Sequence, residues 1–226
     1  MQKEFVETFD MYAERAVAEG ACETKTDFNK MYMNRDYKYT EEYIDKIKES
    51  YLKGGASSIV NAEAIENAFD TYGTVGRGRD GNFTTSCIED NKLCFDENGI
   101  KSASDIAQIK GVGPNTYKSG MYQYEYAPQF VKSCNEAGVV CIPNGDTVGA
   151  SSLNIPGCKT WAGYNMEYSE SELMMPSIKT EGFDSDDVFS AIVNNGFFEI
   201  KNPTVLTSDG TEMVVEGKFR INKLGD

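Results

Sequence analysis

The stretch FFEIKNPTVLTSDGTEMVVEGKFRI, residues 197–221, has the pattern of β-strands separated by turns. Its apolar runs cover 197–201, 204–207 and 213–221, and each is rich in the β-branched and aromatic residues that strands favour. Ser208-Asp209-Gly210 supplies turn chemistry between the last two runs. We therefore predict an antiparallel meander in this part of the chain.

The sequence ahead of this stretch changes between helical and strand-like patterns. Apolar residues recur at spacings of three and four over four ranges, which predicts amphipathic helices at 2–19, 41–53, 57–72 and 185–194. Thr40 is a suitable N-cap for the second helix, and Gly54-Gly55 would end it. Strands are predicted at 122–126, where tyrosines alternate with polar residues, and at the short apolar runs 139–142 and 161–168, while 21–39 has the character of a loop.

Along the chain, the predicted helices come first, a region of strands and loops that contains cysteines follows, and one helix with further strands comes last. This order predicts an α+β fold. At 226 residues the chain is long enough for one large domain or two small ones. We predict two, residues 1–126 and 127–226, each a helix packed on a small antiparallel sheet.

The cysteines repeat a pattern. Ser-Cys-x6-Cys occurs twice with Asn-Gly just beyond, and the offset is the same for both cysteines, since 134 − 87 = 47 and 141 − 94 = 47. The repeat predicts either two disulfide-linked units or a structural zinc site in which four thiolates converge; free thiols are the third alternative. The four residues are Cys87, Cys94, Cys134 and Cys141, and Cys22 and Cys158 are the extra members of either arrangement.

Charge and histidine content exclude several functions. With 22 basic and 36 acidic residues the net charge is −14, which disfavours nucleic acid and anionic lipid as partners. Histidine is absent, which removes His-based triads and most catalytic zinc sites and lowers the expectation of an enzyme. A hydrolase that uses paired carboxylates stays open, although a solvated acidic surface is the default interpretation of Glu167, Glu170, Glu172, Asp184, Asp186 and Asp187.

Two glycine-containing motifs are weak. Residues 105–114 resemble the helix-hairpin-helix pattern of DNA-backbone binders, but 117–120 are not an apolar second helix. We favour a short helix capped by Ser102 or Ser104. The run 76–81 lacks the Lys-Ser/Thr ending of a phosphate loop, so we assign it no nucleotide.

The pattern also resembles a known family. Residues 58–72, SIVNAEAIENAFDTY, resemble the Ala/Asn-rich segment that leads to Tyr in type IV pilins, and residues 5–17 resemble the amphipathic second half of the pilin N-terminal helix. The cysteine repeat and the second helix-then-strands set resemble clostridial pilins with two pilin-like domains in one subunit.

This resemblance implies a pilin-like fold, with an amphipathic helix on an antiparallel sheet, and a non-enzymatic function. The chain would be a subunit of an extracellular type IV pilus (a fimbrium) in adhesion or motility. Its partners would be other pilin subunits and a host surface or another cell, with no nucleic acid, and membrane contact only through an apolar helix preceding residue 1. Two alternatives stay open: a secreted carboxylate-based hydrolase and a helix-hairpin-helix nucleic-acid binding module.

Overall fold

The computed structural model describes Glu14 and residues 41–76, 83–110, 113–139, 173–207 and 209–225. Apart from Glu14, which is helical, and Val139, the predictions for 2–19, 21–39, 139–142 and 161–168 lie outside these residues. None of the helices in the described ranges is long and apolar enough to cross a membrane.

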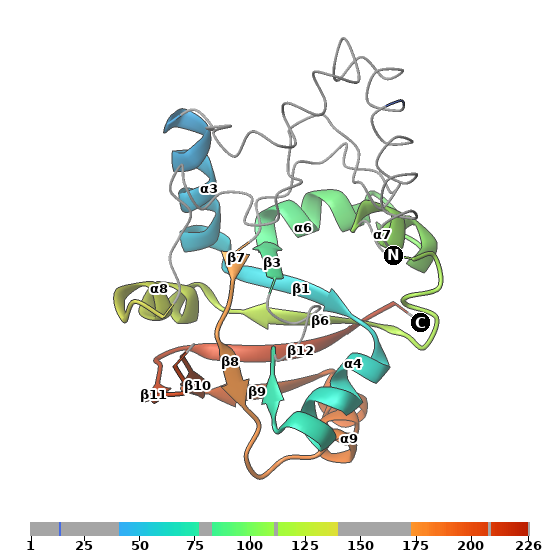
Figure 1. Cartoon of the computed structure of the whole chain (residues 1–226). Helices are drawn as coiled ribbons and strands as arrows, with labels where there is room; N and C mark the ends of the chain where they lie inside the picture. Colours follow the sequence, from blue (N-terminus) through green and yellow to red (C-terminus); the bar gives the residue numbers. More distant parts are fainter. Residues whose placement is uncertain are drawn as a thin grey trace.

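Two antiparallel sheets form the centre of the described structure (Figure 1). The larger sheet has the order β7 (Leu173–Met174), β3 (Phe83–Ser86), β1 (Ala56–Val60), β6 (Met121–Tyr126), β12 (Lys218–Leu224) and β9 (Phe197–Lys201). The smaller sheet has the order β11 (Glu212–Val214), β10 (Thr204–Leu206), β8 (Ser177–Lys179) and β2 (Thr74–Val75), and β4 (Phe95–Asp96) pairs with β5 (Gly99–Ile100). The predicted α+β class with antiparallel sheets is therefore confirmed.

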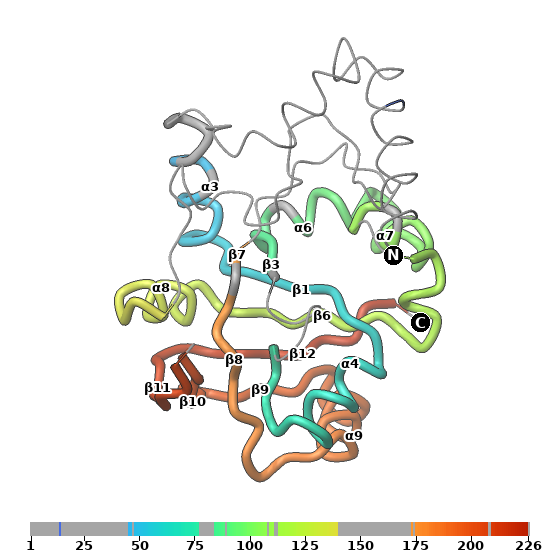
Figure 2. The backbone as a smooth tube through the Cα atoms, viewed as in Figure 1, coloured from blue at the N-terminus to red at the C-terminus, as the bar shows by residue number. Residues whose placement is uncertain are grey.

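Helices lie on both faces of the larger sheet (Figures 1 and 2). One face packs against α6 (Cys87–Cys94) and α7 (Ala103–Ile109). The opposite face packs against α4 (Ala62–Glu66), the π-helix η1 (Asn67–Tyr72), α8 (Pro128–Glu136), α9 (Ser185–Asn195) and the smaller sheet. Helix α3 (Glu41–Gly54) leads into β1 and contacts α8 and α6.

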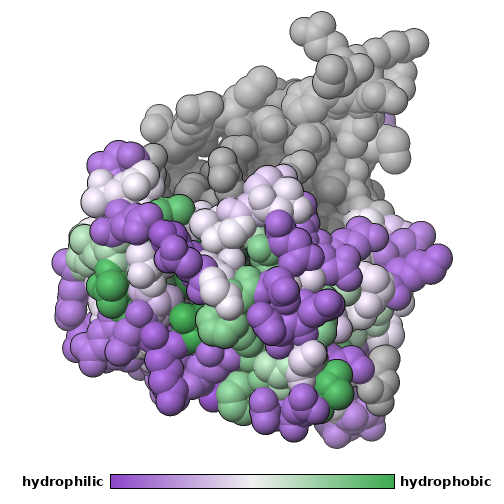
Figure 3. All heavy atoms as spheres, turned by 90° about the horizontal axis from the view of Figure 1, so that it is seen from below, coloured by the Kyte–Doolittle hydropathy of each residue, from purple (hydrophilic) through white to green (hydrophobic). Residues whose placement is uncertain are grey.

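Alternating side chains of the central strands separate the two cores. Tyr124 and Tyr126 of β6 point to the main core, where their rings pack on Phe219 with centroids 5.4 and 5.2 Å away, and Tyr126 stacks on Phe130. Met121 of β6 belongs instead to the smaller core beneath α6 and α7. The outer surface seen from below is mostly hydrophilic, with apolar patches between the charged side chains (Figure 3).

The predicted helix at 185–194 and the predicted strand at 197–201 are confirmed. Helix α9 begins with a reciprocal capping box, in which the Asp184 carboxylate accepts from the Asp187 N–H at 2.9 Å, and it ends at Gly196 with φ 84°. Strand β9 has the predicted bounds Phe197–Lys201. Both elements carry strong local signals, namely capping residues and an apolar aromatic run.

The helix predicted over 57–72 is wrong in its first part. Residues Ala56–Val60 form β1, a strand buried along its whole length between β3 and β6, and the helix begins only after Asn61. The Asn61 side chain accepts from the Ala64 N–H at 2.8 Å and caps α4. Small serines beside Ile59 and Val60 suit a central strand that is buried on both faces, which overrides the helical spacing.

The strand predicted over 213–221 is divided at Gly217. Its first part is β11, paired with β10, and its second part is β12, paired with β6 and β9 in the other sheet. Gly217 has φ +127°, and its N–H donates to the Asn202 side chain at 3.0 Å. The predicted meander therefore exists only as the β10–β11 hairpin.

The predicted boundary at 126/127 falls between β6 and α8. Strands from both sides pair directly, since β6 lies between β1 and β12 in one sheet. The two-domain division stays a prediction without support from the strand pairing. Nothing in this arrangement of sheets is specific to a pilin.

Candidate functional site

One line of opposed residues crosses five strands of the larger sheet. Thr85 opposes Ser57, Ser57 opposes Glu125, and Glu125 opposes Arg220, which opposes Glu199. Opposed residues of neighbouring strands point to the same face of a sheet, and this is the face of Ile59 and Met121 beneath α6 and α7. We call these five residues the polar row.

The Arg220 end of the polar row is an ion-pair network. The Arg220 guanidinium donates from Nε and Nη2 to Glu199 Oε2 at 3.2 and 2.7 Å, and its Cζ lies 4.0 Å from the centre of the Phe197 ring. Lys218 Nζ lies 3.5 Å from Glu199 Oε1. The bond from Arg220 holds the pKa of Glu199 below its usual value, and the nearby charges of Lys218 and Arg220 add to this, so Glu199 is a charge-compensated carboxylate.

Glu125 has a different environment. Its Oε2 accepts from the Asn222 side-chain amide at 2.7 Å, which is a neutral donor. Glu125, Ala127, Glu199, Lys218 and Arg220 line a hollow of about 130 Å³. Because small-molecule sites enclose about 300–1,000 Å³, this hollow is large enough for only part of such a ligand.

The other end of the row is strand β3, whose three hydroxyl groups each contact a different element. Thr84 Oγ1 donates to the Leu173 carbonyl of β7 at 2.9 Å. Thr85 Oγ1 donates to Asp90 of α6, and Ser86 Oγ accepts from the Ile88 N–H at 3.2 Å and also bonds to Ser50 of α3. The buried hydroxyls thus connect β3 to β7, α6 and α3.

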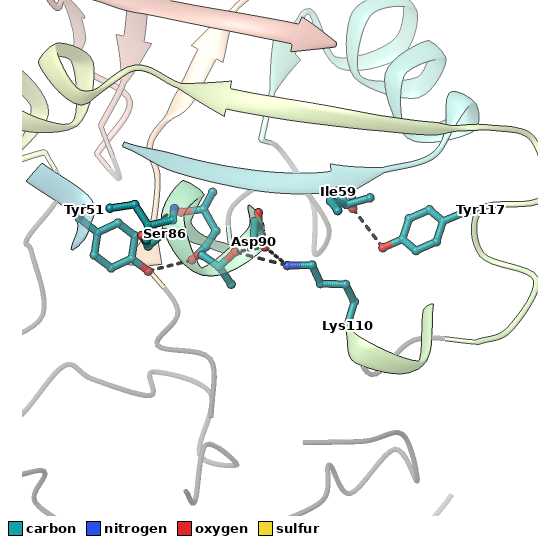
Figure 4. Close-up of polar contacts among 9 residues, drawn as sticks. Tyr51, Ile59, Ser86, Asp90, Lys110 and Tyr117 are labelled. Atoms are coloured by element: carbon teal, nitrogen blue, oxygen red, sulfur yellow. Dashed lines mark hydrogen bonds and ion pairs between the residues drawn. The ribbon is translucent and has the colours of Figure 1, made fainter. Parts of the chain in front are cut away.

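Asp90 and Lys110 form a buried ion pair beside Thr85 (Figure 4). Asp90 projects from α6 and its side chain is completely buried, while the Lys110 side chain, just after α7, is 11% exposed. Lys110 Nζ also donates to Thr85 Oγ1 at 3.3 Å. Asp90 Oδ2 is a buried polar atom without a hydrogen-bond partner among the described residues.

Cys87 lies at the start of α6, close to this cluster. Burial, together with the nearby charges of Asp90 and Glu125, raises the pKa of its thiol to about 12. Burial likewise raises the pKa of Cys134 to about 12. Both thiols are therefore protonated at neutral pH, which makes them poor nucleophiles.

The structure separates the cysteines that the repeat placed together. Cys87 and Cys134 are free thiols, so neither is bridged to Cys94. Cys87 and Cys94 stand at opposite ends of α6, and Cys134 lies in α8. Seven residues of helix span about 10 Å, beyond the reach of a disulfide, so Cys87 and Cys94 do not bridge in this conformation. No group of three or more metal-ligating side chains occurs among the described residues, and Cys22, Cys141 and Cys158 lie outside them, so the zinc site stays a prediction.

The predicted acidic residues are also separated. Asp184 and Asp187 form the capping box of α9 and Asp186 lies in its first turn, whereas Glu167, Glu170 and Glu172 lie outside the described residues. Helix α7 is present as a short helix with Ser102 accepting from the Asp105 N–H, as expected. Residues 114–119 form turns and not a second helix, which contradicts the helix-hairpin-helix alternative.

Sequence reasoning missed most of the site. Its residues come from distant parts of the chain, and no periodicity relates Ser57, Thr85, Glu125, Glu199 and Arg220. Two missed helices did carry signals: Ser86-x-x-Glu89 has the form of a capping box before α6, and Pro128 occupies the first turn of α8.

Comparison with known proteins identifies a different family from the predicted one. A family model described as "NAD glycohydrolase catalytic domain" (NADase_NGA) matches residues 31–226. A search of curated proteins gives no match.

This match overturns the type IV pilin resemblance and what was inferred from it: a non-enzymatic subunit, adhesion and motility, and pilin subunits or cell surfaces as partners. The resemblance depended in part on the composition of residues 58–72, of which Ser58, Ile59 and Val60 lie in strand β1 and not in a helix. The alternative of a carboxylate-based hydrolase agrees better with the match.

Proposed function

The chain belongs to the family of NAD glycohydrolase catalytic domains, and we propose from this that it hydrolyses NAD to nicotinamide and ADP-ribose. The observation that carries the proposal is the match over residues 31–226, which takes in both sheets and the whole polar row. The substrate partner is then a small dinucleotide.

The absence of histidine is compatible with this reaction. The ring nitrogen of nicotinamide carries a positive charge while it is bonded to ribose, so nicotinamide leaves as a neutral molecule and needs no proton from a general acid. The remaining demands are stabilisation of an oxocarbenium-like ribose and placement of a water molecule, and carboxylates meet both in glycoside hydrolysis. The expectation that a chain without histidine is a poor enzyme candidate does not apply to this bond.

We propose that the substrate binds on the face of the larger sheet that carries the polar row. Three carboxylates lie there, and two of them, Asp90 and Glu199, are each paired with a cation. Glu125 has a neutral amide as its partner and lines the hollow, so of the described carboxylates it is the candidate to face a cationic ribose. The sequence adds Glu170 and Glu172, which come immediately before β7 in the chain.

The test is release of nicotinamide from NAD by the purified chain, followed by chromatography. The variants E125Q, E170Q and E172Q remove one candidate carboxylate each, and E212Q, on β11 of the smaller sheet, is the matched control. We expect the wild-type chain and E212Q to release nicotinamide and at least one of the three other variants to lose about 10²-fold or more in kcat, the scale of a lost electrostatic contact to the transition state. A wild-type chain that melts cooperatively and yet releases no nicotinamide would refute the proposed function.

We further propose that the protein is exported. The support is compositional: six cysteines, 13 tyrosines and 21 glycines are typical of exported proteins. Fractionation of the producing cells, with antibodies to the chain, tests this by showing whether the protein appears in the medium.

A further inference from the structure

We propose that the buried Asp90–Lys110 ion pair is a positioning device that sets the place of strand β3, and through it the catalytic rate. The two side chains are positioning residues and not catalytic ones, since Asp90 is completely buried. The kinetic part of this proposal rests on the NAD hydrolysis proposed above.

The ion pair lies where two helices meet the larger sheet. Asp90 belongs to α6, Lys110 follows α7, and both bond to Thr85 in β3, so one cluster joins two helices to a strand (Figure 4). Taking two charges out of water costs free energy that their attraction only partly returns, so a buried pair is weak evidence for a stabilising role. A polar cluster of this kind does, however, select one geometry, because its hydrogen bonds are directional.

Strand β3 lies between β7 and β1 in the larger sheet. On one side it pairs with β7 through Thr84–Leu173, supported by the bond from Thr84 Oγ1 to the Leu173 carbonyl. On the other side Thr85 opposes Ser57, which opposes Glu125. The candidate carboxylate Glu125 is therefore connected to β3 along the polar row.

Single and double variants of the ion pair distinguish a positioning role from a stabilising one. Removing one partner leaves a buried charge without compensation, so D90N and K110M should each lose stability as well as activity. The double variant D90N/K110M removes both charges, and the carboxamide that replaces the Asp90 carboxylate keeps an oxygen that accepts from Thr85. Its stability should return close to that of the wild type, whereas the geometry of β3 is no longer defined by the pair.

The experiment compares four proteins: wild type, D90N, D90N/K110M and the control K179M/E212Q. The control removes an ion pair at 2.9 Å between β8 and β11 of the smaller sheet. The measurements are Tm, hydrogen exchange of peptides covering β3 and β7, and kcat and KM for NAD. For D90N/K110M we expect a Tm within a few degrees of wild type, faster exchange in β3 and β7 only, an unchanged KM, and a kcat lower by about 10- to 100-fold, the range for a misplaced catalytic group.

Wild-type hydrogen exchange in β3 and β7 of D90N/K110M would overturn the proposal. Wild-type values of both Tm and kcat in this double variant would overturn it as well, because a pair that only stabilises the fold predicts that the two values return together. Hydrogen exchange is measured on the protein without NAD. A wild-type chain without NAD hydrolysis would therefore refute the proposed function, while the exchange comparison would still decide whether the pair positions β3.

Discussion

Gly217 is the residue at which the chain passes from the smaller sheet to the larger one. The substitution G217A tests whether the chain packs closely against α8 at this point. A Cβ at this position would lie 2.5 Å from the Phe130 nitrogen, 2.6 Å from its Cα and 2.7 Å from its Cβ. Phe130 is completely buried in α8, and two of these atoms belong to the backbone, so a change of rotamer does not relieve the clash.

The size of the effect follows from two contributions. The φ of +127° is one that residues with a side chain rarely adopt, and strain of this kind costs about 1–3 kcal/mol. Overpacking of a filled site adds about 1–3 kcal/mol, so G217A should lower the free energy of unfolding by about 2–6 kcal/mol. For a chain of this length each kcal/mol lowers Tm by about 2–4 °C, so a fall of roughly 5–20 °C is expected.

Gly210 provides the matched control, because it has φ +82° and an added Cβ would meet nothing within 4 Å. G210A therefore has only the strain contribution, and G217A should exceed it by the steric one, about 1–3 kcal/mol. Thermal melts by circular dichroism and urea titrations measure both variants. Equal destabilisation by G217A and G210A would refute the close packing of β12 against α8.

Three other substitutions or assays test particular contacts. D184A removes the capping box of α9 and should cost about 0.5–2 kcal/mol in urea unfolding; no change would mean that the cap does not form in solution. R220M tests the ion pair between Arg220 and Glu199. The pKa of Glu199 is lower in the folded state than its unfolded pKa of about 4.3, so the pair stabilises the fold above that pH. This stabilisation is lost as the pH falls through the folded-state pKa. The free energy of unfolding should therefore fall less steeply with acidification between about pH 5 and pH 2 in R220M than in the wild type, and equal slopes would contradict the pair. Native Cys87 and Cys134 should react with a thiol reagent at pH 8 far more slowly than after denaturation, because their pKa values are raised to about 12; a zinc assay on the same sample tests the predicted thiolate site, which about one zinc per chain would support.

Much of the secondary structure was accessible from the sequence because its signals are local. The Asp-rich first turn and the following Asn195-Gly196 predict α9, and alternation of the tyrosines predicts β6. The secondary-structure predictions were wrong where burial of a segment outweighed its local preference for helix. Ile59 has helical spacing to later apolar residues, yet it lies in β1, because β3 and β6 pair with the two edges of this segment and a hydrophobic core covers each of its faces.

The sequence by itself determined the α+β class, the position of several elements and the lack of histidine chemistry, since these depend on composition and on neighbours within a few residues. Only the tertiary structure decided which residues form the polar row. Ser57, Thr85, Glu125, Glu199 and Arg220 lie far apart in the sequence, and each was one polar residue among many. Strand pairing places them at one register on one face of the sheet, and α6 and α7 bring Asp90 and Lys110 to the end of that line, because antiparallel pairing aligns side chains without regard to their separation along the chain.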